Sequence, residues 1–337
     1  MKILFIGGTG TISTAISKKL VANPENELYL LNRGNRNNII PGAKEIIANI
    51  YDEADVAKKI DGMYFDVVAE FIAFGVESLE RDYRLFNGKC SQFIFISSAS
   101  AYQKPVGHYL INESTPLCNP YWEYSRNKID CEDYLNSVYR NAGFPITIVR
   151  PSHTYDERNV PLGVHGKNGP YQVIKRIIDG KPVILHGDGT SLWTMTHNSD
   201  FADAFIGLLG NQKAIGEAVQ ITSDESISWN QIYDAIGAAL GKEVKRYYVP
   251  SDLLAKTSDY DFEGGLIGDK ANSVVFDNSK IKRLVPGFCA KKPFSVGVKE
   301  TIDYCLSHPE CQTEDPEFDA YCDKLIEKLD GVVESFK

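Results

Sequence analysis

The sequence predicts an α/β fold, in which a doubly wound parallel sheet is followed by a smaller C-terminal lobe. Short apolar runs alternate with amphipathic helical segments over residues 1–150, which is typical of parallel strands joined by helices. This alternation loosens after Pro151. We therefore expect a first domain over 1–150, a second lobe mostly over 151–315 with some segments returning to the sheet, and a C-terminal helix over 316–337.

Short apolar runs predict the strands, and their lack of alternation fits strands buried on both faces. We expect these strands at 2–6, 28–31, 45–48, 65–69, 92–97 and 145–150, and further strands at 183–185 and 218–221. Apolar residues at helical spacing predict helices. They are expected at 12–21, 77–86, 122–141, 200–209, 228–240 and 298–306, with a helix or turn at 51–60.

Composition narrows the class of protein. The net charge of −9 over 337 residues argues against nucleic-acid binding as the main function of the protein. No apolar run reaches the roughly 20 residues that span a bilayer, and the N-terminus reads as a core strand rather than a signal peptide. Seven cysteines without CxxC spacing indicate reduced thiols, and no histidine pair has metal-ligand spacing. We expect a cytoplasmic protein without a membrane segment or a metal.

A glycine-rich turn follows the first expected strand at once. Gly7, Gly10 and Ser13 have the spacing of a dinucleotide-binding turn, with Thr11 and Ile12 opening the helix. Glycines let the backbone approach a pyrophosphate closely, and the free N–H groups of the helix N-terminus attract the anion. A small serine at the third position still allows close helix–strand packing. We therefore predict dinucleotide binding here, in preference to a purely structural turn.

The second expected strand ends in basic residues. An NAD site usually has an acidic residue at this point to hold the ribose 2′-hydroxyl. This chain has Asn32, Arg33 and Arg36 instead, and guanidinium groups can bind a 2′-phosphate with two hydrogen bonds. We predict NADP rather than NAD as the cofactor, with NAD still possible. The alternative is a solvated basic loop.

A tyrosine and a lysine stand four residues apart on the expected long helix. Tyr124 and Lys128 would lie on one helix face, with Cβ atoms about 5–6 Å apart. The ammonium would lower the pKa of the phenol toward working pH and make it a usable acid or base. Ser98, in competition with Ser97 and Ser100, could hold a substrate oxygen beside it. The alternatives are a solvated helix face and serines that cap a strand end.

Other residues have mainly structural explanations. Trp229 is expected in the core, and His165 and His186 are expected in surface loops. The charged segment 156–158 either lines a substrate mouth or is solvated. The helix at 316–337 carries an apolar side and either docks back or pairs with another subunit.

With these residues in hand, the chain resembles the extended short-chain dehydrogenase/reductase superfamily, of the NAD(P)-dependent epimerase/dehydratase type. The resemblance covers nearly the whole chain. It rests on Gly7-x-x-Gly10-x-x-Ser13, Asp66-Val-Val, Ser97-Ser98, Tyr102, Tyr124-x-x-x-Lys128, Arg150-Pro151, and Thr196-His197 leading into Asp200.

The resemblance implies roles for matching residues. Tyr124 would be the acid/base, Ser98 would position the substrate oxygen, and Lys128 would hold the nicotinamide ribose and tune the tyrosine. Further cofactor contacts would come from Asn49, Ile50, Phe71, Ile72, Ala73, Ser97, Pro151 and His153. Substrate contacts would come from Ser100, Tyr102, Trp193 and His197. A homodimer is what the superfamily suggests.

Two departures from the family pattern bear on the substrate and the site. Glu70 stands where a histidine is common. Trp193 stands where nucleotide-sugar members usually carry an arginine for the diphosphate, which argues against a nucleotide sugar. The indole could stack on a sugar ring or pack in the core.

The implied function is hydride transfer at a hydroxyl or ketone carbon of a sugar-like small molecule, either as an oxidoreductase or as an epimerase. Ser98-Ala99-Ser100 lacks the acidic pair of a dehydratase. The alternative is a non-catalytic NADP(H)-binding regulator or an RNA-associated protein of the same fold. The acidic net charge makes a nucleic-acid partner the weaker expectation.

Overall fold

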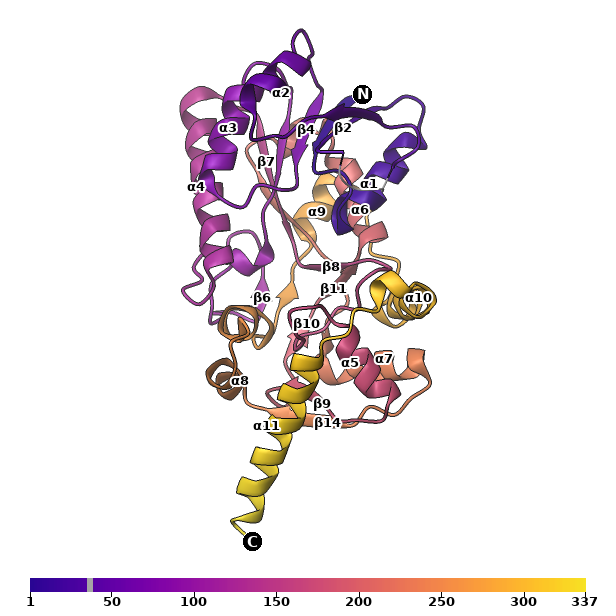
Figure 1. The fold of residues 1–337 in the computed structure, drawn as a ribbon. Coiled ribbons are helices and arrows are strands. Elements are labelled where there is room, and N and C mark those ends of the chain that lie inside the picture. Colours follow the sequence, from indigo (N-terminus) through magenta and orange to yellow (C-terminus); the bar gives the residue numbers. More distant parts are fainter. Residues whose placement is uncertain (35–38) are drawn as a thin grey trace.

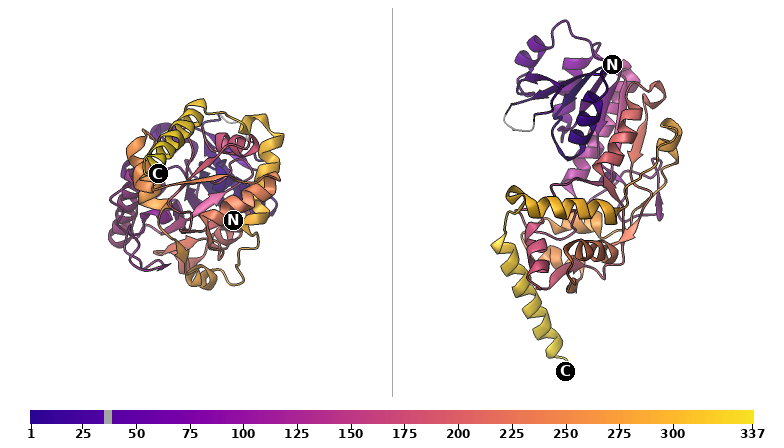
Figure 2. Two further views of the ribbon diagram at one scale, coloured as in Figure 1. Left: turned by 90° about the horizontal axis from the view of Figure 1, so that it is seen from below. Right: turned by 90° about the vertical axis from the view of Figure 1, so that its right-hand side faces the viewer.

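The molecule is elongated, with a sheet-containing lobe at one end and a smaller lobe at the other (Figures 1 and 2). The computed structural model describes residues 1–34 and 39–337. The last helix, α11 (Pro316–Glu334), begins against the smaller lobe and projects away from it toward the C-terminus.

A seven-stranded parallel sheet forms the first lobe, as the sequence predicts. Its order is β12-β7-β5-β4-β1-β2-β3, and every pairing is parallel. The strand order reverses between β1 and β4, and ligands of such sheets bind beyond the strand ends at this point. The strands are β1 (Lys2–Ile6), β2 (Glu27–Asn32), β3 (Lys44–Ile47), β4 (Val67–Glu70), β5 (Phe93–Ile96), β7 (Ile146–Pro151) and β12 (Ala218–Ile221).

Helices cover both faces of this sheet because alternate strand residues point to opposite sides. Ile3 and Phe5 of β1 face a core closed by α1 (Thr11–Val21), α6 (Asn198–Leu208) and α9 (Ser279–Leu284). Leu4 and Ile6 face a second core closed by α2 (Glu53–Lys59), α3 (Val76–Phe86) and α4 (Glu123–Ala142). Thus β12, α6 and α9 are the segments of the C-terminal half that return to the sheet.

The smaller lobe has its own core, built from short strand pairs and helices. Its strand pairs are β8 (His153–Tyr155) with β11 (Met195–His197), β9 (Val183–His186) with β14 (Arg246–Val249), β10 (Leu192–Trp193) with β13 (Ile227–Ser228), and β6 (Leu110–Ile111) with β15 (Val275–Phe276). Its helices are α5 (Tyr171–Ile178), α7 (Trp229–Leu240), α8 (Ser251–Thr257), α10 (Phe294–Ser307) and α11, together with a π-helical segment, Glu263–Lys270.

The expected core position of Trp229 is confirmed, because its side chain is fully buried. The expectation for His186 is wrong. It ends strand β9 and is buried, with its ring 4.9 Å from the ring of Trp229. The apolar neighbours on both sides of the strand explain this burial. His165 is half-buried in its loop, and its ring nitrogen Nδ1 lies 2.8 Å from the Gly166 carbonyl oxygen.

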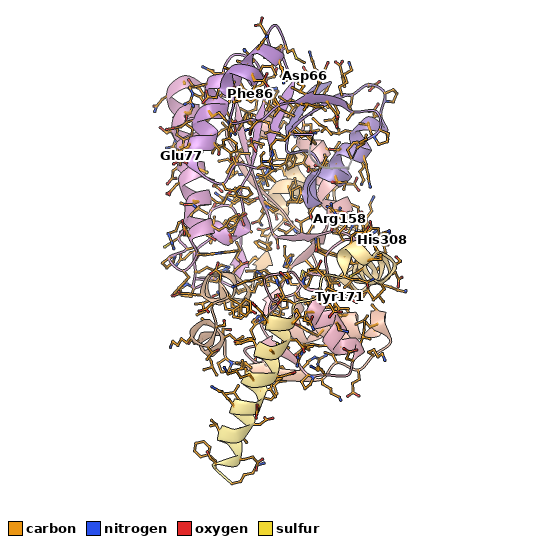
Figure 3. All side chains as sticks on the ribbon, in the orientation of Figure 1. Asp66, Glu77, Phe86, Arg158, Tyr171 and His308 are labelled. Carbon is orange, nitrogen blue, oxygen red and sulfur yellow. The ribbon has the colours of Figure 1, made fainter. Side chains whose placement is uncertain are left out.

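The charged segment 156–158 lies away from the predicted substrate mouth. Arg158 forms an ion pair with the buried carboxylate of Asp156. Figure 3 shows Arg158 on the side of the molecule where α10 and His308 lie. This pairing ties down the loop after β8, so its charges are structural.

The amphipathic C-terminal helix is confirmed over Pro316–Glu334. Phe318 and Leu325 are buried against the smaller lobe, whereas Val332 and Phe336 are 54% and 87% exposed. Among the residues that the structure describes, no helix combines the length and apolar character needed to cross a bilayer.

A buried ion pair joins α4 to the end of β7. Glu132 is fully buried and accepts hydrogen bonds from Nε and Nη2 of Arg150 at 2.9 and 2.5 Å. The Ser97 hydroxyl donates to the same carboxylate. This network fixes the carboxyl ends of β5 and β7 against the long helix, and those ends border the site described below.

We expect Glu132→Gln to lower the free energy of unfolding by about 3–5 kcal/mol, because it leaves the Arg150 charge buried without its carboxylate. The matched control is Glu53→Gln, which removes the carboxylate of the exposed pair with Arg84. That change is expected to have little effect on stability, because an exposed ion pair is screened by water. Urea unfolding followed by circular dichroism measures both. Equal costs for the two variants would contradict this account.

Candidate active site

The turn after β1 has a shape that only glycine permits. Gly7 has φ of +85°, and a Cβ there would stand 2.4 Å from Cγ2 of Ile72. Ser13, in place of the third glycine of the motif, ties this turn together. Its hydroxyl accepts a hydrogen bond from the Gly10 N–H and donates one to the Gly7 carbonyl, both at 2.9 Å. The serine therefore supports the turn rather than degrading it.

A cavity of about 640 Å³ opens beside this turn, at the carboxyl ends of β1, β2 and β4. Most of the expected cofactor residues line it, namely Gly7, Gly10, Thr11, Ile12, Asn32, Arg33, Asn49, Ile50, Phe71 and Ile72. Arg36 lies outside the described residues. Lining residues that sequence reasoning missed include Gly34, Glu45, Tyr51, Phe74 and Ile96.

The lining of this first cavity fits a dinucleotide. The first turn of α1 carries no acidic residue, so its free N–H groups face the cavity unopposed by a neighbouring carboxylate. The backbone approaches closely where Gly7 meets Ile72 and where a Cβ on Gly8 would stand 2.4 Å from Leu30. A cavity of this volume lies within the range of cofactor sites.

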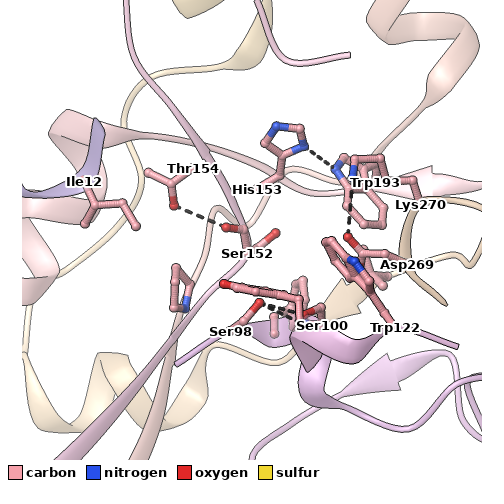
Figure 4. A pocket seen from close by; sticks show the side chains of 15 residues that line it. Ile12, Ser98, Ser100, Trp122, Ser152, His153, Thr154, Trp193, Asp269 and Lys270 are labelled. Carbon is pink, nitrogen blue, oxygen red and sulfur yellow. Dashed lines mark hydrogen bonds and ion pairs between the residues drawn. The ribbon is translucent and has the colours of Figure 1, made fainter. Parts of the chain in front are cut away.

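A second cavity of about 350 Å³ adjoins the first, since Ile12 lines both. Figure 4 shows Ile12 and Thr154 at one end of it, and Trp122, Trp193, Asp269 and Lys270 together at the other. The remaining lining residues are Ser98, Ala99, Ser100, Tyr124, Pro151, Ser152, His153, Val274 and Phe276. Ser98 and Tyr124, which sequence reasoning paired, are therefore brought into one cavity.

Three serine hydroxyls form a hydrogen-bonded chain at the second cavity. The buried Ser125 hydroxyl donates to the Ser100 oxygen at 2.8 Å, and the Ser98 and Ser100 oxygens are 2.9 Å apart. The Ser98 oxygen also accepts the Ser100 N–H at 3.1 Å. This chain fixes the Ser98 hydroxyl at the floor of the cavity.

The expected drop in the tyrosine pKa is wrong for this structure. Burial raises the pKa of Tyr124, and a hydrogen bond with Ser98 opposes the rise. The Lys128 ammonium lies 5.8 Å from the Tyr124 ring centre, but it donates to the carbonyls of Ala73 and Ile96, each at 2.8 Å. Burial lowers the pKa of Lys128 itself to about 8. Lys128 and Ala73 thus lie behind the lining of the cavities.

Comparison with known proteins identifies the family. A model described as the NAD dependent epimerase/dehydratase family matches residues 3–222, more than half of the chain. The chain belongs to this family. The resemblance inferred from the motifs is confirmed, and the family is NAD-dependent.

The curated relatives have low sequence identity to this chain, but the matches cover most of each protein. The chain is 27% identical to a putative UDP-glucose 4-epimerase of Methanocaldococcus jannaschii, over 71% of this chain and 82% of that protein. It is 22% identical to 2'-dehydrokanamycin reductase of Streptomyces kanamyceticus, over 86% and 80%. It is also 26% identical to a chloroplast stem-loop binding protein of 41 kDa of Arabidopsis thaliana, over 71% and 63%.

Among solved structures, a UDP-glucuronic acid 4-epimerase of Bacillus cereus superposes with a TM-score of 0.73 and 20% identity. That match covers 91% of this chain and 99% of the other. At this identity the likeness shows the shared fold.

Several expected site residues lie outside both cavities in this family member. Tyr102 is fully buried in the core, where its hydroxyl donates a hydrogen bond to the Gln220 side chain. His197 caps α6 through Ser199. Ser97 is turned to Glu132. Pro151 and His153 line the second cavity rather than the first, and Ser100 and Trp193 line it as expected.

The second cavity also contains residues that sequence reasoning missed. Trp122 stands two positions before Tyr124, and Asp269 and Lys270 end the π-helical segment 263–270. The signal that could have found this segment is its run of three glycines within five positions, 264–268. A Cβ on Gly264 would stand 2.2 Å from Cδ1 of Trp122, so the two segments are packed together.

Glu70 positions the strand end beneath the glycine turn. Its fully buried carboxyl accepts the Ile72 N–H at 2.5 Å, and Nη2 of Arg81 lies 3.5 Å away. Burial, the charge of Asp82 and a hydrogen bond with Asp82 raise the pKa of Glu70 well above its usual value. Burial also raises the pKa of Asp82, to about 6.

Glu70 should make stability depend on pH. Because its pKa is raised on folding, the folded state holds a proton that the unfolded chain releases above about pH 4. Stability is therefore expected to fall as pH rises toward the raised pKa, by up to about 1.4 kcal/mol per pH unit for one proton. Glu70→Gln should flatten this slope, while Glu80→Gln at an exposed position should keep it. Urea unfolding between pH 5 and pH 8 tests this, and parallel curves for all three proteins would contradict it.

Proposed function

We propose that the chain catalyses NAD(P)-dependent oxidation–reduction or epimerisation at a hydroxyl or ketone carbon of a sugar-like substrate, with Tyr124 as the acid/base. The observation that carries this proposal is that Ser98 and Tyr124 line a cavity that joins the dinucleotide cavity at Ile12. A substrate carbon in the second cavity can therefore reach a nicotinamide ring held in the first.

The first cavity and its surroundings would hold the cofactor. The N–H groups from Gly7 to Ile12 would bind the pyrophosphate, and Arg33 would contact the adenosine end. When bound, a nicotinamide dinucleotide supplies the redox half of the reaction, by accepting or returning a hydride.

The residues of the second cavity would handle the proton. Since the Ser98 oxygen accepts the Ser100 N–H, its own hydrogen can be donated to a substrate oxygen. Burial keeps Tyr124 protonated at neutral pH, which suits proton donation to a ketone oxygen. In the opposite direction Tyr124 must lose its proton, and the hydrogen bond with Ser98 favours the phenolate.

A second candidate function is a non-catalytic NADP(H)-binding regulator or RNA-associated protein. The observation that favours it is the likeness to the chloroplast stem-loop binding protein. Ser98, Tyr124 and Lys128 are all present, however, and a pure regulator needs none of them.

Tyr124→Phe is expected to lower turnover at least about 100-fold, because the variant lacks the proton that the reaction moves. NADPH affinity should stay within about twofold. Absorbance of the reduced cofactor, with product analysis for epimers, would follow reactions with sugars, sugar phosphates and nucleotide sugars. Tyr139→Phe, at an exposed position on the same helix, is the control. Unchanged turnover in Tyr124→Phe would remove the assigned role, and salt-sensitive RNA binding without turnover would favour the second candidate.

We further propose that NADP is preferred, on the strength of Arg33. Glu45 on β3 lines the same cavity and opposes this preference, while the Asn32 side chain is engaged by the Gly34 N–H at 2.8 Å. Arg33→Ala should therefore weaken NADPH binding about tenfold and leave NADH binding within twofold, since only NADPH carries the 2′-phosphate. Fluorescence titration measures both affinities, and Lys18→Ala on the outer side of α1 is the control. Equal losses for both nucleotides would refute the assignment.

A further inference from the structure

The end of the second cavity opposite Ile12 carries side chains suited to recognising a substrate. Figure 4 shows Trp122, Trp193, Asp269 and Lys270 gathered there, opposite Ile12. They come from three separate parts of the chain: the residues before α4, strand β10 and the π-helical segment. Trp122 lies beside Tyr124, with ring centres 5.0 Å apart, so this group of residues adjoins the serine and tyrosine without moving the proton itself.

The two indoles are held in place through their own N–H groups. Nε1 of Trp122 donates to Asp261 at 2.9 Å, and Nε1 of Trp193 donates to Nδ1 of His153 at 3.1 Å. Gly264 allows the π-helical segment to pack directly on Trp122. Rigid apolar rings that line a cavity can pack against the C–H face of a sugar ring.

Two lysines flank one carboxylate at this end of the cavity. Lys104 is buried, its Nζ has no hydrogen-bond partner in the described structure, and it lies 4.0 Å from Asp269. Burial lowers the pKa of Lys104, and the charge of Asp269 opposes that shift. Asp269 also lies 3.7 Å from Nζ of Lys270. The Asp269 carboxylate is thus shared between two lysines.

Lys270 is the ammonium that reaches the cavity. It lines the cavity, and its Nζ lies 5.7 Å from the Trp122 ring centre. Nearby His153 does not add to the positive charge, because burial lowers its pKa to about 3 and Lys270 itself disfavours its protonation. Sequence reasoning found no cation at position 193. Lys270 supplies a positive charge from a different element, close to Trp193, the residue that stands in place of the family's arginine.

We propose that Lys270 binds an anionic substituent, phosphoryl or carboxylate, on a sugar-like substrate whose ring packs against Trp122 and Trp193. This inference rests on the proposed function, because it names the substrate class of the same site. The ammonium and the two indoles would hold the substrate so that a hydroxyl or ketone carbon faces Ser98 and the neighbouring Tyr124. Lys270 is thus assigned to specificity and not to proton transfer.

The test is a binding measurement on the NADPH-saturated protein. Two of the three tryptophans line the cavity, so tryptophan fluorescence reports on it directly. Glucose 6-phosphate, glucuronate and glucose are the probes, and the first two distinguish a phosphoryl from a carboxylate group. We expect at least one anionic probe to bind ten times more tightly than glucose, with an affinity that falls as ionic strength rises.

Lys270→Met should reduce the affinity for that anionic probe at least tenfold and leave glucose unchanged. Lys270→Arg, which keeps the charge, should restore most of it, and Lys324→Met at an exposed position of α11 should have no effect. For a substrate on which the protein is active, Lys270→Met should raise KM and leave kcat within about twofold. Equal binding of charged and neutral probes, no binding of any probe, or an unaffected Lys270→Met variant would overturn the inference.

Failure of the proposed function gives a different pattern. Charge-selective binding that depends on Lys270, without turnover in the wild type, would keep the anion site and reject the assigned chemistry. Turnover that depends on Tyr124 but not on Lys270 would keep the chemistry and reject the anion site.

Discussion

The site depends on the close approach of the first glycine turn to the end of β4. Gly7 and Ile72 meet with no room for a Cβ, while Ser13 closes the turn from one side and Glu70 holds the Ile72 N–H from the other. The first cavity is shaped by this contact, and the second begins at Ile12, just beyond the turn. A side chain at position 7 would have to displace the Ile72 side chain and would strain the backbone at a φ of +85°.

The first lobe was predictable from sequence because its signals are local. The sheet strands up to residue 150 are short apolar runs, the helices that cover them carry helical periodicity, and the glycine turn follows β1 directly. The π-helical segment escaped prediction because its role depends on a partner far away in the sequence, namely Trp122. Tyr102 was misassigned for a related reason: its motif position is correct, but Gln220 and the core around it decide where the hydroxyl points.

Burial, which spacing alone does not reveal, also decides the protonation of the site. The four-residue interval between Tyr124 and Lys128 predicted proximity, and the rings and carbonyls around them reverse the expected pKa change. The same holds for Glu70, whose carboxyl lies next to Arg81 yet has a raised pKa because desolvation and Asp82 outweigh that charge. For Tyr124 and Lys128 the spacing therefore identified two groups that lie near each other, and the surroundings set their protonation.

The chain passes between the two lobes repeatedly. After β7 it builds the smaller lobe, returns for α6 and β12, leaves again for α7 and the π-helical segment, returns for α9, and ends in α10 and α11 (Figure 1). Neither lobe is a continuous stretch of sequence, and the sheet lacks its last strand if the chain stops at residue 150. Such interleaving couples the stability of the first cavity to that of the second cavity. A proteolytic cut or an exchanged segment in the smaller lobe is therefore expected to destabilise both lobes. A new specificity is expected to evolve by replacement of side chains rather than by exchange of an intact module.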